Sequence, residues 1–165
     1  MNHINSMKSL RNIDIYISFM LMFCLTSCED QMTADDEFEY LESGFMGMCF
    51  WGLYNNGYQE VIIKDEQSYQ NFGDSVRIEI YNLDCSTATL PNIDFNKYFL
   101  IGKPTDGGGC SATYDRQIIV NEEDKNLIYK IDVDYSGFCA MLITNMNWVL
   151  IPYKYFDYSI EFQVE

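Results

Sequence analysis

Apolar and polar residues alternate along several segments of the chain, and this pattern predicts β-strands. From Tyr158 to Val164 every second side chain is aromatic or aliphatic, which is the pattern of a half-buried strand. Thr113 to Val120 and Leu127 to Val133 are rich in β-forming residues, and the polar run between them predicts a hairpin. Compact apolar runs predict one strand at Tyr98 to Gly102 and a strand or pair of strands at Ala140 to Ile151.

The remaining segments give a more mixed pattern. Phe45 to Leu53 predicts a first strand or a bulged edge, and Glu60 to Lys64 predicts a further strand. Asp65 to Phe72 begins with a residue that can cap a helix and predicts a short helix. Ser75 to Tyr81 fits either a continuation of that helix or a strand. Lys103 to Gly109 (KPTDGGG) predicts a flexible loop.

These segments predict a single globular α+β domain over residues 45–165. We expect a mostly antiparallel β-sheet of about six or seven strands with one or two short helices, since most connections are of hairpin length. The apolar content of 48% and aromatic content of 16% suffice for one core, and the length suits one ordinary domain.

The first 27 residues have the organisation of a secretory signal. Lys8 and Arg11 form a short basic region, and Ile15 to Leu25 is an uncharged apolar run. That run is far shorter than the roughly 20 residues of a membrane-spanning helix. Leu25-Thr26-Ser27-Cys28 follows it and resembles a bacterial lipobox. The resemblance implies cleavage before Cys28, lipid on its sulfur and an acylated N-terminus, hence an anchor in the bilayer.

Residues 28–44 are predicted to form an acidic, lipidated tether. From Glu29 to Gly44 the chain has seven acidic residues and no basic one, so the segment repels itself and stays solvated. As a flexible chain it would reach roughly 20–25 Å. The Glu29-Asp30 pair resembles the acidic export signal of surface lipoproteins in some Gram-negative lineages, and a plain spacer is the alternative. We therefore expect an outer-membrane lipoprotein of the cell envelope. Three side chains in the tether can still pack on the domain: Phe38, Tyr40 and Leu41.

The even number of cysteines in the predicted domain indicates disulfides, because the chain is exported. These are Cys49, Cys85, Cys110 and Cys139. If the predicted hairpin turns between residues 123 and 124, Cys110 faces about position 137, close to Cys139. This predicts Cys110–Cys139 and leaves Cys49–Cys85; each loop of about 30 residues would contribute ~3.5 kcal/mol. Four zinc thiolates are the alternative, but zinc ligands usually come in close pairs and no CxxC is present.

Charge and histidine content exclude several classes of function. Ten basic and 25 acidic residues give a net charge of −15, which disfavours nucleic acid as a partner. Removal of the signal leaves 8 basic and 24 acidic residues. The one histidine, His3, lies in the signal, so the mature chain can form neither a Ser-His-Asp nor a Cys-His arrangement. We therefore expect a non-enzymatic protein without a cofactor.

Acidic clusters offer two alternatives to that expectation. Asp132 and Asp134 share one face of a strand, and Glu122-Glu123-Asp124 lies at a hairpin tip. Either cluster can bind Ca²⁺, although neither has the spacing of a dedicated calcium loop. Paired carboxylates also serve small hydrolases. The alternative functions are therefore a carboxylate-based hydrolase and a calcium- or glycan-binding accessory protein. The simpler interpretation is that these acids are solvated on an outward face of the sheet.

Two groups of residues are candidates for contact with a protein partner. One is the aromatic cluster that follows Pro152: Tyr153, Tyr155 and Phe156. The other is the glycine-rich loop beside the predicted disulfide: Asp106, Gly107 and Gly108.

The order of several short motifs resembles a known family. These are Gly44 to Gly47, Val61 to Ile63 before a short helix, Pro91 to Phe95, Tyr98 to Ile101 and Val149 to Pro152. Together they resemble small lipoprotein domains related to the protease-complex-stabilising subunit family. The resemblance implies a non-enzymatic domain that binds and stabilises a secreted or surface partner. The extra cysteines and the missing charged residue after Pro152 depart from the pattern, so a protease partner does not follow directly.

Overall fold

A computed structural model describes residues 37–42, 44–50, 60–78 and 84–165. Its strands are β1 (Glu39–Tyr40), β2 (Val61–Ile63), β3 (Tyr98–Gly108), β4 (Ser111–Asn121), β5 (Asn126–Ser136), β6 (Leu142–Pro152) and β7 (Ser159–Val164). The helices are α2 (Glu66–Val76) and the 3-10 helix η3 (Tyr153–Tyr155).

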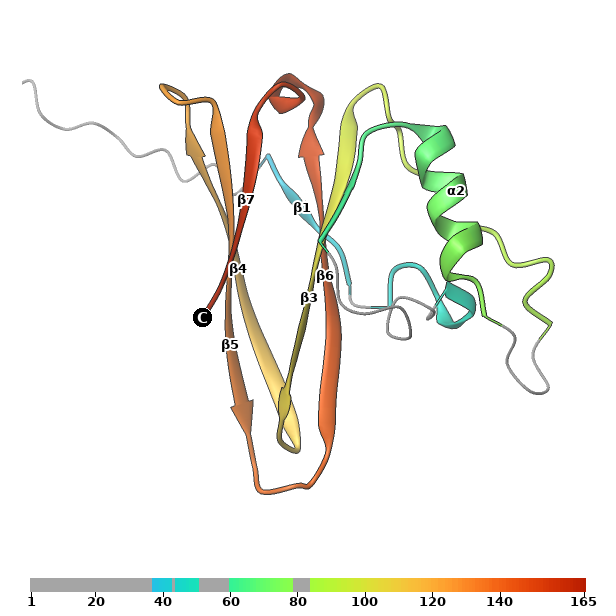
Figure 1. The fold of residues 1–165 in the computed structure, drawn as a ribbon, viewed down its shortest axis with the longest axis vertical. Helices are drawn as coiled ribbons and strands as arrows, with labels where there is room; N and C mark the ends of the chain where they lie inside the picture. Colours follow the sequence, from blue (N-terminus) through green and yellow to red (C-terminus); the bar gives the residue numbers. More distant parts are fainter. Residues whose placement is uncertain (1–36, 43, 51–59, 79–83) are drawn as a thin grey trace, which may run out of the picture. The chain divides into compact units, whose positions relative to one another are not determined.

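The strands form two sheets (Figure 1). The four-stranded sheet has the order β1-β6-β3-β2, and all of its pairs are antiparallel. The three-stranded sheet has the order β4-β5-β7; β4 is antiparallel to β5, whereas β7 is parallel to β5. The predicted α+β class with mostly antiparallel strands is confirmed, and the parallel pair was not predicted.

The two sheets pack face to face around one apolar cluster. Alternate residues of β3 and β6 point toward the other sheet and are buried there. The cluster consists of Phe99, Ile101, Val149 and Ile151 from the first sheet, Ile118, Leu127, Tyr129 and Ile131 from the second, together with Phe38 and Tyr155.

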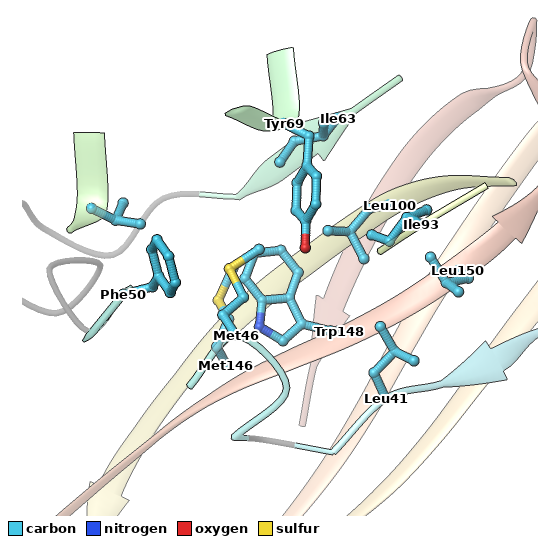
Figure 2. Close-up of a cluster of buried hydrophobic side chains, with 11 residues drawn as sticks. Leu41, Met46, Phe50, Ile63, Tyr69, Ile93, Leu100, Met146, Trp148 and Leu150 are labelled. Carbon is cyan, nitrogen blue, oxygen red and sulfur yellow. The ribbon is translucent and has the colours of Figure 1, made fainter. Parts of the chain in front are cut away.

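A second cluster covers the opposite face of the four-stranded sheet (Figure 2). Trp148 at its centre is 1% exposed. Helix α2 contributes Tyr69 and Val76, and Figure 2 shows the Tyr69 ring pointing into this apolar group. The Cys49–Cys85 disulfide, with Cα atoms 5.4 Å apart, joins two segments that border the cluster. The four-stranded sheet is therefore the central layer.

Helix α2 begins where it was predicted to begin. The Asp65 carboxylate caps it by accepting a 2.8 Å hydrogen bond from the Ser68 backbone N–H. Tyr69, Gly73 and Val76 repeat at helical spacing on the buried face. The helix ends at Val76, so of the segment from Ser75 to Tyr81 only the first two residues are helical. Positions 79–83 lie outside the described residues.

Two predictions near the start of the domain were wrong. Residues 44–50 form turns and a short 3-10 segment, not the strand expected from Phe45 to Leu53, whose positions 51–53 lie outside the described residues. Packing of Met46 and Phe50 into the core explains the apolar pattern without a strand. The domain also begins before residue 45, because Glu39–Tyr40 pairs with β6 and Phe38 is buried.

Within the described segments, no helix has the length and apolarity needed to span a bilayer.

Candidate partner-binding surface

Two chain connections meet at the lower end of Figure 1, and we refer to residues 107–111 and 136–142 there as the disulfide tip. Cys110 and Cys139 form a disulfide, with Cα atoms 4.9 Å apart. The Cys110 N–H donates to the Ser136 carbonyl at 2.7 Å, and the Gly109 N–H donates to the Met141 carbonyl at 3.2 Å. Covalent and backbone bonds thus hold the β3–β4 turn against the β5–β6 connection.

The predicted pairing of the cysteines is confirmed. The β4–β5 hairpin pairs Asn121 with Asn126 and Ser111 with Ser136, which is the register expected from a turn centred between residues 123 and 124. This register brings Cys110 beside the chain that leads to Cys139. The other two cysteines, Cys49 and Cys85, are bonded to each other as expected.

The glycine-rich segment is not the predicted flexible loop. Strand β3 continues to Gly108 and pairs with β6, including Gly107 with Ile143 and Gly108 with Leu142. A Cβ atom at Gly107 would lie 2.4 Å from the Tyr135 ring, and one at Gly109 would lie 2.9 Å from the Ser136 carbonyl oxygen. These glycines therefore allow close packing in regular structure, a role that their sequence alone does not distinguish from loop flexibility.

The disulfide tip exposes three large apolar side chains within five residues. Phe138 is fully exposed, and Met141 and Leu142 are 58% and 65% exposed. Elsewhere among the described residues the exposed large apolar side chains are dispersed through the sequence, for example Ile119 on β4. Isolated exposed apolar residues are common, whereas several that lie close together in the chain indicate a candidate interaction site. Sequence reasoning placed Asp106, Gly107 and Gly108 beside this surface but missed Phe138, although the uncharged run from Ser136 to Asn145 was visible.

Acidic residues surround the uncharged tip. Moving away from it, the first charged residue on β3 is Asp106, on β4 Asp115 and on β5 Asp134, while β6 has none. All three carboxylates are exposed, and none forms an ion pair with another described residue. We refer to these three residues as the acidic collar.

A buried polar layer lies between the tip and the apolar core. Asn147 is fully buried and donates to the Lys103 carbonyl and to Thr105 Oγ1, both at 3.1 Å. Its own side-chain oxygen accepts a 2.9 Å bond from Asn145. Because buried polar groups left unpaired are costly, these bonds favour the observed alignment of β3 with β6.

Only part of the aromatic cluster that was predicted to contact a partner is exposed to solvent. Tyr153 is 44% exposed and stacks on Phe156, with ring centroids 4.8 Å apart. Tyr155, in contrast, is 4% exposed: its ring stacks on Phe38 and its hydroxyl donates to Glu37 at 3.3 Å. Tyr155 was thus wrongly predicted as a contact residue, because it anchors the incoming chain inside the domain.

An open cleft of about 560 Å³ adjoins Tyr153 and is also lined by residues 64–66 and 92–96. Its carboxylates are engaged locally. The backbone N–H of Ser68 lowers the pKa of Asp65, and that of Asn96 lowers the pKa of Asp94. Both groups therefore stay ionised near neutral pH, which makes them unsuited to donate a proton.

In each acidic cluster considered for calcium, at least one carboxylate is engaged by another side chain of the protein. Lys130 Nζ lies 3.2 Å from Asp132 and 3.1 Å from Glu165. Glu122 accepts a hydrogen bond from Tyr158, and Asp124 accepts one from Asn121. In the described part of the chain, no three His, Cys, Asp or Glu side chains are grouped as a metal site.

The predicted lipidation site, Cys28, and the predicted signal segment lie outside the described residues. Comparison with protein-family models, curated proteins and solved structures finds no match to the chain.

Proposed function

We propose that this chain is an exported lipoprotein, anchored in the outer membrane through acylated Cys28, that binds a protein partner through the disulfide tip and catalyses no reaction. The basic region, the short apolar run and Leu25-Thr26-Ser27-Cys28 support the anchor. The motif order that resembles protease-complex-stabilising subunits supports a stabilising role. The partner is a secreted or surface protein, and proteases are one class of such partners.

The exposed cluster of Phe138, Met141 and Leu142 carries the proposal. Burying one such side chain in an interface contributes on the order of 1.5–3 kcal/mol. The disulfide and the backbone bonds of the tip already hold this connection in place. Binding therefore costs less conformational entropy than ordering an open loop would.

A photo-crosslinking amino acid tests the proposal when it replaces Phe138 in the full chain in its native envelope. We expect a discrete adduct with one partner protein. The same amino acid at Ile119, another exposed apolar position but outside the tip, is the matched control and should give no such adduct. Absence of an adduct at position 138, or the same adduct from both positions, would contradict contact through the tip.

A further inference from the structure

We infer that the disulfide tip binds a partner protein whose apolar pocket is bordered by Lys or Arg side chains, and that this surface lies at the end of the described domain opposite to Glu37, where the described chain begins. The inference rests on the proposed function and adds the chemistry of the partner and the end of the domain at which it binds.

The first support is the arrangement of charge around the apolar side chains. Phe138, Met141 and Leu142 project from a region without charges, and the nearest charged residues on three of its strands are all aspartates. When a pocket of the partner buries these apolar side chains, the partner residues that border the pocket, which form its rim, come close to the acidic collar. A basic rim is attracted there and an acidic rim is repelled, which sets both partner choice and association rate.

The same charges argue against a second copy of this chain as the occupant. Two tips in contact would bring two acidic collars together, six carboxylates in all, without a basic residue of the tip to compensate them. The net charge of each copy, −15 for the full sequence and −16 after removal of the predicted signal, adds to the repulsion.

The second support is the place where the chain enters the domain. Glu37 lies 2.6 Å from Lys154 Nζ, and Phe38 stacks on Tyr155, so the chain enters beside η3. Strand β6 runs from the tip at Leu142 to Pro152, directly before η3. At about 3.3 Å per residue, the length of β6 separates the two ends by about 33 Å.

The described chain therefore begins at the end of the domain opposite to the tip, and its first residues leave the side chains of the tip exposed to a partner protein.

Three collar substitutions test the inference in the chain that carries the crosslinker at position 138. They are Asp106→Asn, Asp115→Asn and Asp134→Asn. The matched control removes the same charge from exposed acids outside the tip: Glu42→Gln, Glu123→Gln and Asp157→Asn. We expect the collar variant to lower adduct yield about tenfold at low salt and to weaken its salt dependence, and the control to keep both.

Mass spectrometry of the adduct distinguishes the possible occupants. A partner protein crosslinked within a surface that contains Lys or Arg is the expected result. A phospholipid adduct or an adduct between two copies of this chain would overturn the inference. An adduct with another protein that forms equally in the collar variant would overturn the basic rim but leave the proposed function standing. No adduct at all would overturn both.

Discussion

Gly137 shows at the scale of one residue how the tip is built. Its φ of +86° lies in the left-handed region, and a Cβ atom there would lie 2.5 Å from Cys110 Sγ. Both constraints favour glycine, the first because side chains rarely adopt this conformation and the second because the disulfide fills the space. The residue before exposed Phe138 is thus tied to the geometry of the disulfide.

Gly137→Ala is expected to lower the free energy of unfolding by about 1–3 kcal/mol, because it combines backbone strain with a steric clash. Gly108→Ala is the matched control. A Cβ atom at Gly108 has its nearest neighbour at 4.0 Å and its φ is not positive, so this variant should unfold almost like the parent. Urea unfolding of the oxidised proteins measures both. Equal stabilities for the two variants would show that Gly137 is not constrained as described.

At the scale of the element, helix α2 inserts a polar atom into an apolar cluster. Tyr69 is 1% exposed, and its hydroxyl has no hydrogen-bond partner among the described residues. Burial raises the pKa of Tyr69, and the negative charge of Glu66 adds to the effect. The folded domain therefore accommodates the neutral phenol and disfavours the phenolate.

This predicts a loss of stability in alkali. The unfolded chain ionises its tyrosines near pH 10, while folded Tyr69 stays protonated. The contribution of Tyr69 to the free energy of unfolding is therefore complete below about pH 10, and it is lost as the pH rises above that value. The free energy of unfolding should fall less between pH 8 and pH 11 in Tyr69→Phe than in the parent protein. Tyr153→Phe, at an exposed position, is the control and should behave like the parent.

At the scale of the whole molecule, the two disulfides have different surroundings. Cys110 and Cys139 are both exposed at the tip, where β4 meets the connection between the two sheets. Cys85 of the other bridge is 5% exposed, and Cys49 packs against the apolar cluster below α2. An attacking thiolate therefore reaches the tip disulfide more easily.

Limited reduction followed by alkylation should label Cys110 and Cys139 before Cys49 and Cys85. Peptide mapping over time measures the order. Opening the tip should also reduce crosslinking from position 138, because the disulfide of the neighbouring Cys139 then no longer holds the residue at that position in place. Simultaneous labelling of all four cysteines would mean that the exposure of the bridges does not control their reduction.

Local signals in the sequence determined much of this architecture. The start of α2 depends on Asp65 and its neighbours, and the β4–β5 register depends on the turn between them. The start of the helix and the register of the hairpin each depend only on residues close together in the chain. The register in turn predicted that Cys110 lies near Cys139. The acidic balance and the absence of histidine after His3 likewise need no structure.

Contacts between distant residues decided the rest. Gly107 belongs to a strand because Tyr135 packs on it and Ile143 pairs with it, whereas the same glycines in isolation favour a loop. Tyr155 is buried because Phe38 stacks on it, a contact across most of the domain. Exposure of Phe138 likewise appears only in three dimensions, since phenylalanine is among the residue types most often buried, and here it lies fully exposed on the connection that the disulfide closes.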